Sequence, residues 1–91
     1  MVSFGATCIY VDDGNIFQTA KGDWIRLANV CAPNSAEDGY AEAKNILSNI
    51  ILNKEISYEL VGGSYNRIVA EVWIEEINVN EYMRRKWYIC P

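Results

Sequence analysis

Apolar and polar residues alternate along several stretches of this chain, and a period of two is typical of a strand with one buried face. In residues 24–31, for example, Ile25 and Leu27 share one face. Trp24 and Arg26 share the other. The same reasoning predicts five strands, at residues 6–11, 15–20, 24–31, 55–61 and 67–75. Turn-forming residues predict loops at 12–15, 21–23 and 62–64.

Between the third and fourth strands the apolar spacing changes to three and four residues, which indicates an amphipathic helix. Its apolar stripe consists of Tyr40, Ala43, Leu47, Ile50 and Ile51. We predict a helix over residues 36–53 with Ser35 as its N-cap, and a short helix over residues 80–86. Five strands with a helix between the third and the fourth is the order of an OB-type barrel capped by a helix, a mainly β fold with α.

Length and composition agree with such a fold. The chain has 91 residues, of which 51% are hydrophobic and 22% are charged, so it can form a core and is predicted to be one domain over residues 1–91. No apolar run approaches the ~20 residues that a membrane span needs. The chain does not open on a basic segment followed by an apolar one. We therefore predict neither a signal peptide nor membrane contact.

Charge narrows the classes of function. Twelve acidic residues outnumber eight basic ones, which gives a net charge of −4 and a pI near 4.6. Proteins that bind nucleic acid through its phosphates usually carry a basic excess, so tight non-specific binding of nucleic acid is not expected. The chain has no histidine, which removes imidazole metal ligands and the Ser-His and Cys-His dyads of nucleophilic enzymes.

The chain has three cysteines, Cys8, Cys31 and Cys90. An odd number without CxxC spacing argues against a disulfide framework or a zinc site, although one pair can still close. We expect Cys31 to be a small buried residue at the end of the third strand. The odd count also favours a reducing interior such as the cytoplasm.

Short motifs in a fixed order indicate a family. They are VDDGN at 11–15, IRL at 25–27, VCAPN at 30–34, GYAEA at 39–43, YNR at 65–67 followed by Ala70, and VNE at 79–81. In that order they resemble the Asp-Gly-Asp-Thr turn, the Arg-Leu and Asp-(Thr or Ala)-Pro-Glu stretches, the Gly-x-x-Ala helix start, the Tyr-Gly-Arg strand start and the Val-Asn helix start of the thermonuclease family. Over about residues 6–87 the chain is therefore similar to the staphylococcal nuclease-like domains.

The resemblance implies cleavage of phosphodiester bonds in DNA and RNA with calcium. In the family, two acidic residues hold the metal, a glutamate activates the attacking water, and two arginines hold the phosphate. The metal positions fall on Asn15 and Cys31, and the general-base position falls on Asn34. The arginine positions fall on Arg26 and Arg67, and both arginines are present.

The three replaced acids have a chemical consequence. Calcium prefers charged carboxylates and other oxygen ligands, whereas Asn15 is uncharged and Cys31 offers soft sulfur. Asn34 has no basic oxygen that can take a proton from water, and a missing general base alone lowers a rate by about 10²–10⁴-fold. We therefore predict no intact catalytic set, no metal at Asn15 and Cys31, and no cofactor.

Arg26 and Arg67 are the predicted phosphate- or anion-binding residues, because a guanidinium holds phosphate with two parallel hydrogen bonds. Asn66 is predicted to take the positive φ of the family's glycine. The leading hypothesis is a catalytically degenerate nuclease-like domain that acts as a binding module for nucleic acid, a nucleotide or anion, or a protein. The acidic balance favours a protein or a small anion over a long nucleic acid.

Two alternatives stay open. The first is a divergent metal-dependent phosphodiesterase whose rearranged metal site is built from Asp12, Asp13, Glu37 or Asp38, although the turn explains the first two without a metal. The second is a structural domain with a vestigial site. Residues 84–86, Arg-Arg-Lys, are expected to complement a helix dipole, with a nucleic-acid or partner contact as the alternative. Most tryptophans and tyrosines are expected to pack in the barrel, and exposed ones are candidates for base stacking.

Overall fold

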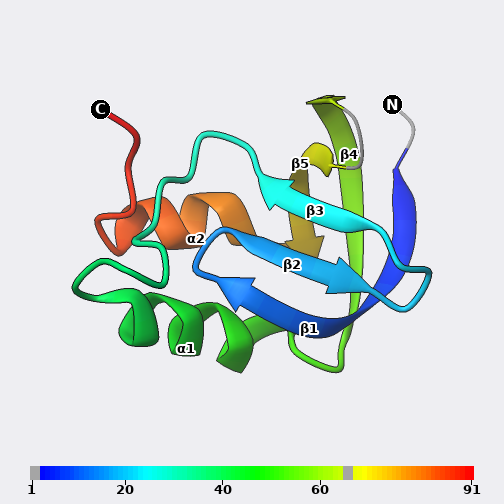
Figure 1. The fold of residues 1–91 in the computed structure, drawn as a ribbon. Coiled ribbons are helices and arrows are strands. Elements are labelled where there is room, and N and C mark those ends of the chain that lie inside the picture. Colours follow the sequence, from blue (N-terminus) through cyan, green and yellow to red (C-terminus); the bar gives the residue numbers. More distant parts are fainter. Residues whose placement is uncertain (1–2, 65–66) are drawn as a thin grey trace.

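The computed structural model describes residues 3–64 and 67–91 (Figure 1). Its elements are β1 (Phe4–Asp13), β2 (Ile16–Thr19), β3 (Trp24–Leu27), α1 (Tyr40–Ile51), β4 (Glu55–Ser64), β5 (Arg67–Ile74), β6 (Ile77–Asn78) and α2 (Val79–Arg85). The strands form one sheet in the order β3-β2-β1-β4-β5-β6. β3 also pairs with β5 in parallel, which closes the first five strands into a mixed barrel. The predicted OB-type barrel with two helices is confirmed.

The core lies inside the barrel and beneath the two helices, which Figure 1 shows on the same side of the strands. Its fully buried side chains include Phe17, Ile25, Leu27, Leu47, Ile51, Val72 and Met83. In α1, three members of the predicted stripe, Ala43, Leu47 and Ile51, are buried, whereas Tyr40 and Ile50 are half-buried. Burial of this stripe fixes α1 against the barrel, because most helical stability in proteins comes from packing of an apolar face.

α1 begins four residues later than predicted, and Ser35 is not its cap. The backbone N–H of Asn34 donates to Glu37 Oε1 at 2.9 Å, and the Asn34 side-chain oxygen accepts from the N–H of Ala36 at 3.0 Å. These polar side chains therefore satisfy a local turn rather than a helix terminus. The N-cap is Gly39, whose φ of 87° lies in the left-handed region that glycine adopts without strain.

β3 is shorter than predicted and ends at Leu27, well before Pro33. Asn29 takes a φ of 57°, which turns the chain out of the strand. Val30 then forms an isolated antiparallel bridge with Ile89. The segment after β3 therefore lies against the C-terminal end of the chain instead of continuing the sheet.

The predicted loop at 62–64 is wrong, because these residues extend β4. Gly62 pairs with Val69 and Gly63 with Ile68, across the hairpin from β5. A side chain on Gly63 would bring its Cβ to 2.9 Å from the Arg67 carbonyl oxygen, so the glycine marks a close approach of two strands rather than a turn. A register shift in β4 follows Leu60, which pairs with the buried Ala70 and is itself 53% exposed. The two-residue strand β6 was not predicted.

A β-bulge in β1 changes the faces of two side chains. Cys8 pairs with Thr19 and Tyr10 pairs with Gln18, so Ile9 is the extra residue. Cys8 is buried and Tyr10 is 45% exposed, on the outer face of the barrel. The alternation of β1 therefore restarts at Tyr10, and a second register shift between Val11 and Asp13 interrupts it again. A strict period of two predicts neither shift.

Trp87 ends α2 in an unusual way. The N–H of Trp87 donates to the Arg84 carbonyl at 3.1 Å, and the N–H of Tyr88 donates to the Met83 carbonyl at 3.2 Å. This is the Schellman arrangement, in which the residue with positive φ is usually glycine. Trp87 has a φ of 78°, and 87% of the residue is exposed. The backbone strain at this position is therefore not offset by burial of the indole ring.

We expect Trp87→Gly to stabilise the protein by about 0.5–1 kcal/mol. The left-handed strain of about 1–2 kcal/mol disappears, and the greater flexibility of glycine in the unfolded chain offsets part of the gain. Urea unfolding followed by circular dichroism measures the shift in midpoint at unchanged slope. Trp87→Ala is the matched control, because alanine keeps the strain. A glycine variant less stable than the alanine variant would contradict the prediction.

Candidate functional site

Arg26 and Arg67 lie on the outer face of the barrel, on the two strands that close it. In the parallel register of β3 and β5, Trp24 pairs with Arg67 and Arg26 pairs with Val69. Paired residues, and residues two apart on one strand, point to the same face. Ile25, between them on β3, is fully buried, so Trp24, Arg26 and Arg67 all point outward. The structure thus brings the two predicted arginines to one surface.

Asp13 lies on the same face as the arginines. It pairs with Ile16 of β2, and Ile16 in turn pairs with Arg26 of β3. Burial raises the pKa of the Asp13 carboxyl above its ordinary value, and the Asn15 backbone N–H, which donates to Oδ1 at 2.9 Å, opposes that rise. The positive charge of Arg67 also lowers this pKa, so the guanidinium and the carboxyl interact electrostatically. Asp13 supplies negative charge beside the arginine pair.

Asn15 is buried, and its hydrogen bonds connect the turn after β1 to the segment after β3. Its side-chain Nδ2 donates to the carbonyl of Val30 at 2.8 Å, and its own carbonyl accepts from the N–H of Leu27 at 2.8 Å. An aspartate here would place a carboxylate against the Val30 oxygen without a proton between them. The amide therefore holds the turn after β1 to the segment after β3, at a position where the family has a metal ligand.

Cys31 is bonded to Cys90 in a disulfide, with the two Cα atoms 4.9 Å apart. Of the possibilities left open by the odd cysteine count, one closed pair is therefore correct. The expectation that Cys31 is a small buried residue at the end of the third strand is wrong, because Cys31 is half-buried and β3 ends at Leu27. The N–H of Cys31 also donates to the Tyr88 carbonyl at 3.2 Å. The disulfide removes the cysteine-based argument for a reducing interior, since such bonds persist in oxidising surroundings.

Cys8 is the free cysteine, and it is completely buried. Burial raises the pKa of its thiol. A buried thiol with a raised pKa is a weak nucleophile, so Cys8 packs in the core rather than taking part in chemistry.

Asn34 is exposed in the loop before α1, where both its backbone and its side chain belong to the turn with Ala36 and Glu37. Its oxygen is occupied by a backbone N–H. The side chain at the family's general-base position therefore supports the loop.

The candidate carboxylates of a rearranged metal site do not gather. Among residues 3–64 and 67–91, no three His, Cys, Asp or Glu side chains lie close enough together to hold a metal ion. Asp12 and Asp13 adjoin the turn after β1, whereas Glu37 bonds to the backbone of Asn34 in its own loop. Tyr65 and Asn66, and with them the predicted positive φ of Asn66, lie outside the described residues.

Four side chains next to the arginines form an aromatic and cationic group, which the sequence analysis did not predict as a group. Tyr10 and Trp24 meet edge to face with ring centroids 6.1 Å apart. Lys44 Nζ lies 5.7 Å from the centre of the Tyr10 ring and 5.6 Å from that of Tyr40. The Tyr40 hydroxyl donates to the Asp12 carbonyl at 2.8 Å, which ties α1 to the end of β1. The alternation of β3 already placed Trp24 beside Arg26, but nothing in the sequence signals the bulge that brings Tyr10 to them.

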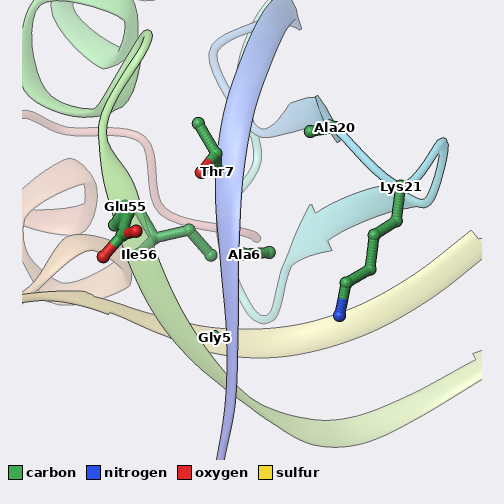
Figure 2. A pocket seen from close by; sticks show the side chains of 7 residues that line it. All are labelled: Gly5, Ala6, Thr7, Ala20, Lys21, Glu55 and Ile56. Atoms are coloured by element: carbon green, nitrogen blue, oxygen red, sulfur yellow. The ribbon is translucent and has the colours of Figure 1, made fainter.

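A pocket of about 300 Å³ lies between β1, the turn after β2 and the start of β4 (Figure 2). Its lining consists of Gly5, Ala6, Thr7, Ala20, Lys21, Glu55 and Ile56. Lys21 and Glu55 lie on opposite sides of β1 in Figure 2, so its two charged groups do not converge. None of the positions matched to the family's site lines this pocket.

The basic residues 84–86 are largely engaged within the domain. Arg84 donates to the Ala28 carbonyl at 3.2 Å, and Arg85 pairs with Glu81 at 2.6 Å one turn earlier on α2. Lys86 Nζ lies 5.5 Å from the centre of the Tyr82 ring. Their place at the end of α2 agrees with the predicted complement to the helix dipole.

These observations define the class of protein. It is a closed OB-type barrel with a pair of arginines on its outer face. A family model described as staphylococcal nuclease homologue matches residues 24–88, which is 65 of the 91 residues. The chain therefore belongs to the staphylococcal nuclease homologue family. The matched range includes Arg26, Cys31, Asn34 and Arg67 but begins after Asn15. No curated protein matches the sequence. Within the described ranges, neither helix is long and apolar enough to cross a membrane.

Proposed function

We propose that this chain is a non-catalytic member of its family and that it binds a phosphate-bearing ligand through Arg26 and Arg67. One observation carries the proposal. Both arginines share the outer face of the barrel, whereas Asn15, Cys31 and Asn34 are each committed to a structural contact. The residues that would bind substrate remain together, and those that would hold metal and activate water have become part of the scaffold.

The missing chemistry supports the absence of catalysis. Cleavage of a phosphodiester needs a group to deprotonate water and a cation to neutralise charge on the phosphate. Asn34 cannot accept a proton, and Asn15 with the disulfide-bonded Cys31 supplies no anionic ligand. The arginines alone would stabilise the bound substrate and the transition state to similar degrees, which gives binding without acceleration.

The charges of the chain limit the size of the ligand. The net charge is −4, and the buried Asp13 lies beside the arginine pair. A long polyanion would meet this negative charge over much of the surface. A nucleotide or a short single-stranded segment needs only the arginine face, so a small phosphate-bearing ligand fits the charge distribution best.

Calorimetry with a nucleoside 3′,5′-bisphosphate tests the proposal. We expect weak binding that decreases with added salt, and about tenfold weaker binding in Arg26→Ala and in Arg67→Ala, since each variant removes a charge-assisted contact. Arg85→Ala is the matched control, because its guanidinium pairs with Glu81 on α2. Equal, undetectable heats in all four proteins would mean that the arginines serve only the structure.

The same proteins are incubated with single-stranded DNA and calcium. We expect no cleavage above the background of a mock purification. Calcium-dependent cleavage that Arg67→Ala abolishes would overturn the non-catalytic assignment and favour the divergent phosphodiesterase.

A further inference from the structure

One row of side chains crosses the outer face of the barrel over four strands. Tyr10 of β1 pairs with Gln18 of β2, Gln18 pairs with Trp24 of β3, and Trp24 pairs with Arg67 of β5. Directly paired residues point to the same face, so these four side chains stand side by side. Arg26 lies two residues beyond Trp24 on β3, on the same face. The aromatic pair is therefore in register with the arginine pair.

The aromatic part of this row has a defined geometry. The Trp24 and Tyr10 rings meet at an interplanar angle of 86°, edge to face. Lys44 from α1 lies over the Tyr10 ring, and Tyr40 on the same helix is bonded to the carbonyl of Asp12 in β1. Trp24 is thus supported on its Tyr10 side and is bordered by Arg67 on the other. A ring fixed in this way loses little freedom when a flat ligand group packs on it.

The spacing suits one nucleotide. Two residues along a strand are about 7 Å apart and neighbouring strands about 5 Å, so the backbone of Trp24 lies within reach of one nucleotide from the backbone positions that carry Arg26 and Arg67. A phosphate held by Arg26 and Arg67 would place the attached ribose over this part of the sheet and the base at Trp24. Aromatic side chains stack on any base, because every base has a π face.

We propose that Trp24 is a specificity-determining residue that stacks on the base of a nucleotide whose phosphate is held by Arg26 and Arg67, with Tyr10 supporting the indole ring. The inference rests on the proposed function, because it needs the arginine pair to bind phosphate. It adds a preference: a phosphate compound with a base binds more tightly than the same compound without one. The barrel face, rather than the arginines alone, then selects the ligand.

Calorimetry with two probes separates the two contributions. The first is a nucleoside 3′,5′-bisphosphate, and the second is the abasic deoxyribose 3′,5′-bisphosphate. We expect the first to bind about tenfold more tightly to the parent protein. Trp24→Ala should remove this difference and leave the affinity for the abasic probe within twofold. Trp24→Phe should keep most of the difference, because phenylalanine retains a stacking surface.

Trp87→Gly is the matched control, because Trp87 is the most exposed tryptophan and lies beyond α2, outside the row. It should leave both affinities unchanged. Circular dichroism confirms that each variant is folded at the temperature of the titration. In the parent protein, the nucleoside probe should quench tryptophan emission and the abasic probe should not. This quenching should disappear in Trp24→Phe.

The outcomes are distinguishable. Equal affinity of the parent for both probes, or an equal loss for both in Trp24→Ala, overturns the role of Trp24 and leaves phosphate binding by the arginines standing. About tenfold weaker binding of both probes to Arg67→Ala, with the tenfold difference between the probes present in the parent, supports both proposals. If neither probe binds the parent at millimolar concentration, both proposals are refuted.

Discussion

Cys31→Ala is expected to lower the free energy of unfolding by about 4 kcal/mol. The Cys31–Cys90 bond joins residues 59 positions apart, and in the chain-entropy account a closed loop of that size restricts the unfolded chain by about this amount. A domain of this length has a total stability of roughly 5–14 kcal/mol, so the loss is a large share of it. Urea unfolding of the oxidised protein and of the variant measures the difference.

Reductant supplies the control for this prediction. Dithiothreitol should move the midpoint of the parent protein to that of Cys31→Ala and should leave the midpoint of the variant unchanged. The free cysteine, Cys8, is buried and forms no disulfide, so it does not account for a reductant effect. A parent midpoint that is the same with and without reductant would show that the bond does not stabilise the native state.

Asn80→Ala is expected to destabilise the protein by about 3 kcal/mol. The Asn80 side chain is fully buried, and its Nδ2 donates to the carbonyls of Ala28 and Ala70, both at 3.0 Å. Its Oδ1 accepts from the N–H of Val72 at 2.9 Å. Alanine leaves the buried N–H of Val72 without this acceptor, which costs about 1–3 kcal/mol. The Ala28 and Ala70 carbonyls each lose one hydrogen bond, worth about 0.5–1.5 kcal/mol, and keep their bonds from Arg84 and from the Ala28 N–H.

Thermal unfolding measures this effect. For a domain of this size, 1 kcal/mol corresponds to about 4–8 °C, so the melting temperature of Asn80→Ala should fall by more than about 10 °C. Asn49→Ala is the matched control, because Asn49 is exposed on α1. It should change the melting temperature by no more than about 3 °C, as ordinary surface substitutions do. Similar melting temperatures for both variants would contradict a structural network at Asn80.

Patterns of apolar residues predicted the elements of this fold well where a strand or helix obeys one period throughout. The stripe of α1 and the alternation of β3 are such cases, and their buried residues are largely those predicted. Prediction failed where a side chain or a backbone turn interrupts the period. The bulge at Ile9 and the left-handed Asn29 are backbone irregularities, and the late start of α1 follows from the local turn of Asn34 with Glu37. The spacing of apolar residues contains none of these features.

The candidate site was predictable to a different extent for each residue. Arg26 could be placed on the outer face from the alternation of β3, and the motif order gave the correspondence with Arg67. The pairing of Cys31 with Cys90 could not be chosen from three cysteines, because it depends on the last residues of the chain folding back along the segment after β3. Tyr10 reaches the outer face beside Trp24 only because of the β-bulge at Ile9, so its position could not be predicted either.

The replaced positions also show why restoring the family's acids is not a local change. Cys31→Asp would break the disulfide, and Asn15→Asp would replace the donor that bonds to the Val30 carbonyl. Both effects would loosen the segment that follows Arg26 on β3. Restoring a metal site by substitution would therefore also require new contacts that hold the segment after β3 against the C-terminal end of the chain.

The Cys31–Cys90 bond also determines how the folded chain carries tension. It closes residues 31–90 into a covalent ring that contains both helices and strands β4, β5 and β6, while β1, β2 and β3 precede the ring. A force that pulls Phe4 away from Pro91 passes through the sulfur atoms and bypasses the ring. Only the three leading strands can then be drawn out. Their ladders with each other, β1 to β2 and β2 to β3, and their ladders with the ring, β1 to β4 and β3 to β5, resist. In the oxidised protein about two thirds of the chain is shielded from stretching.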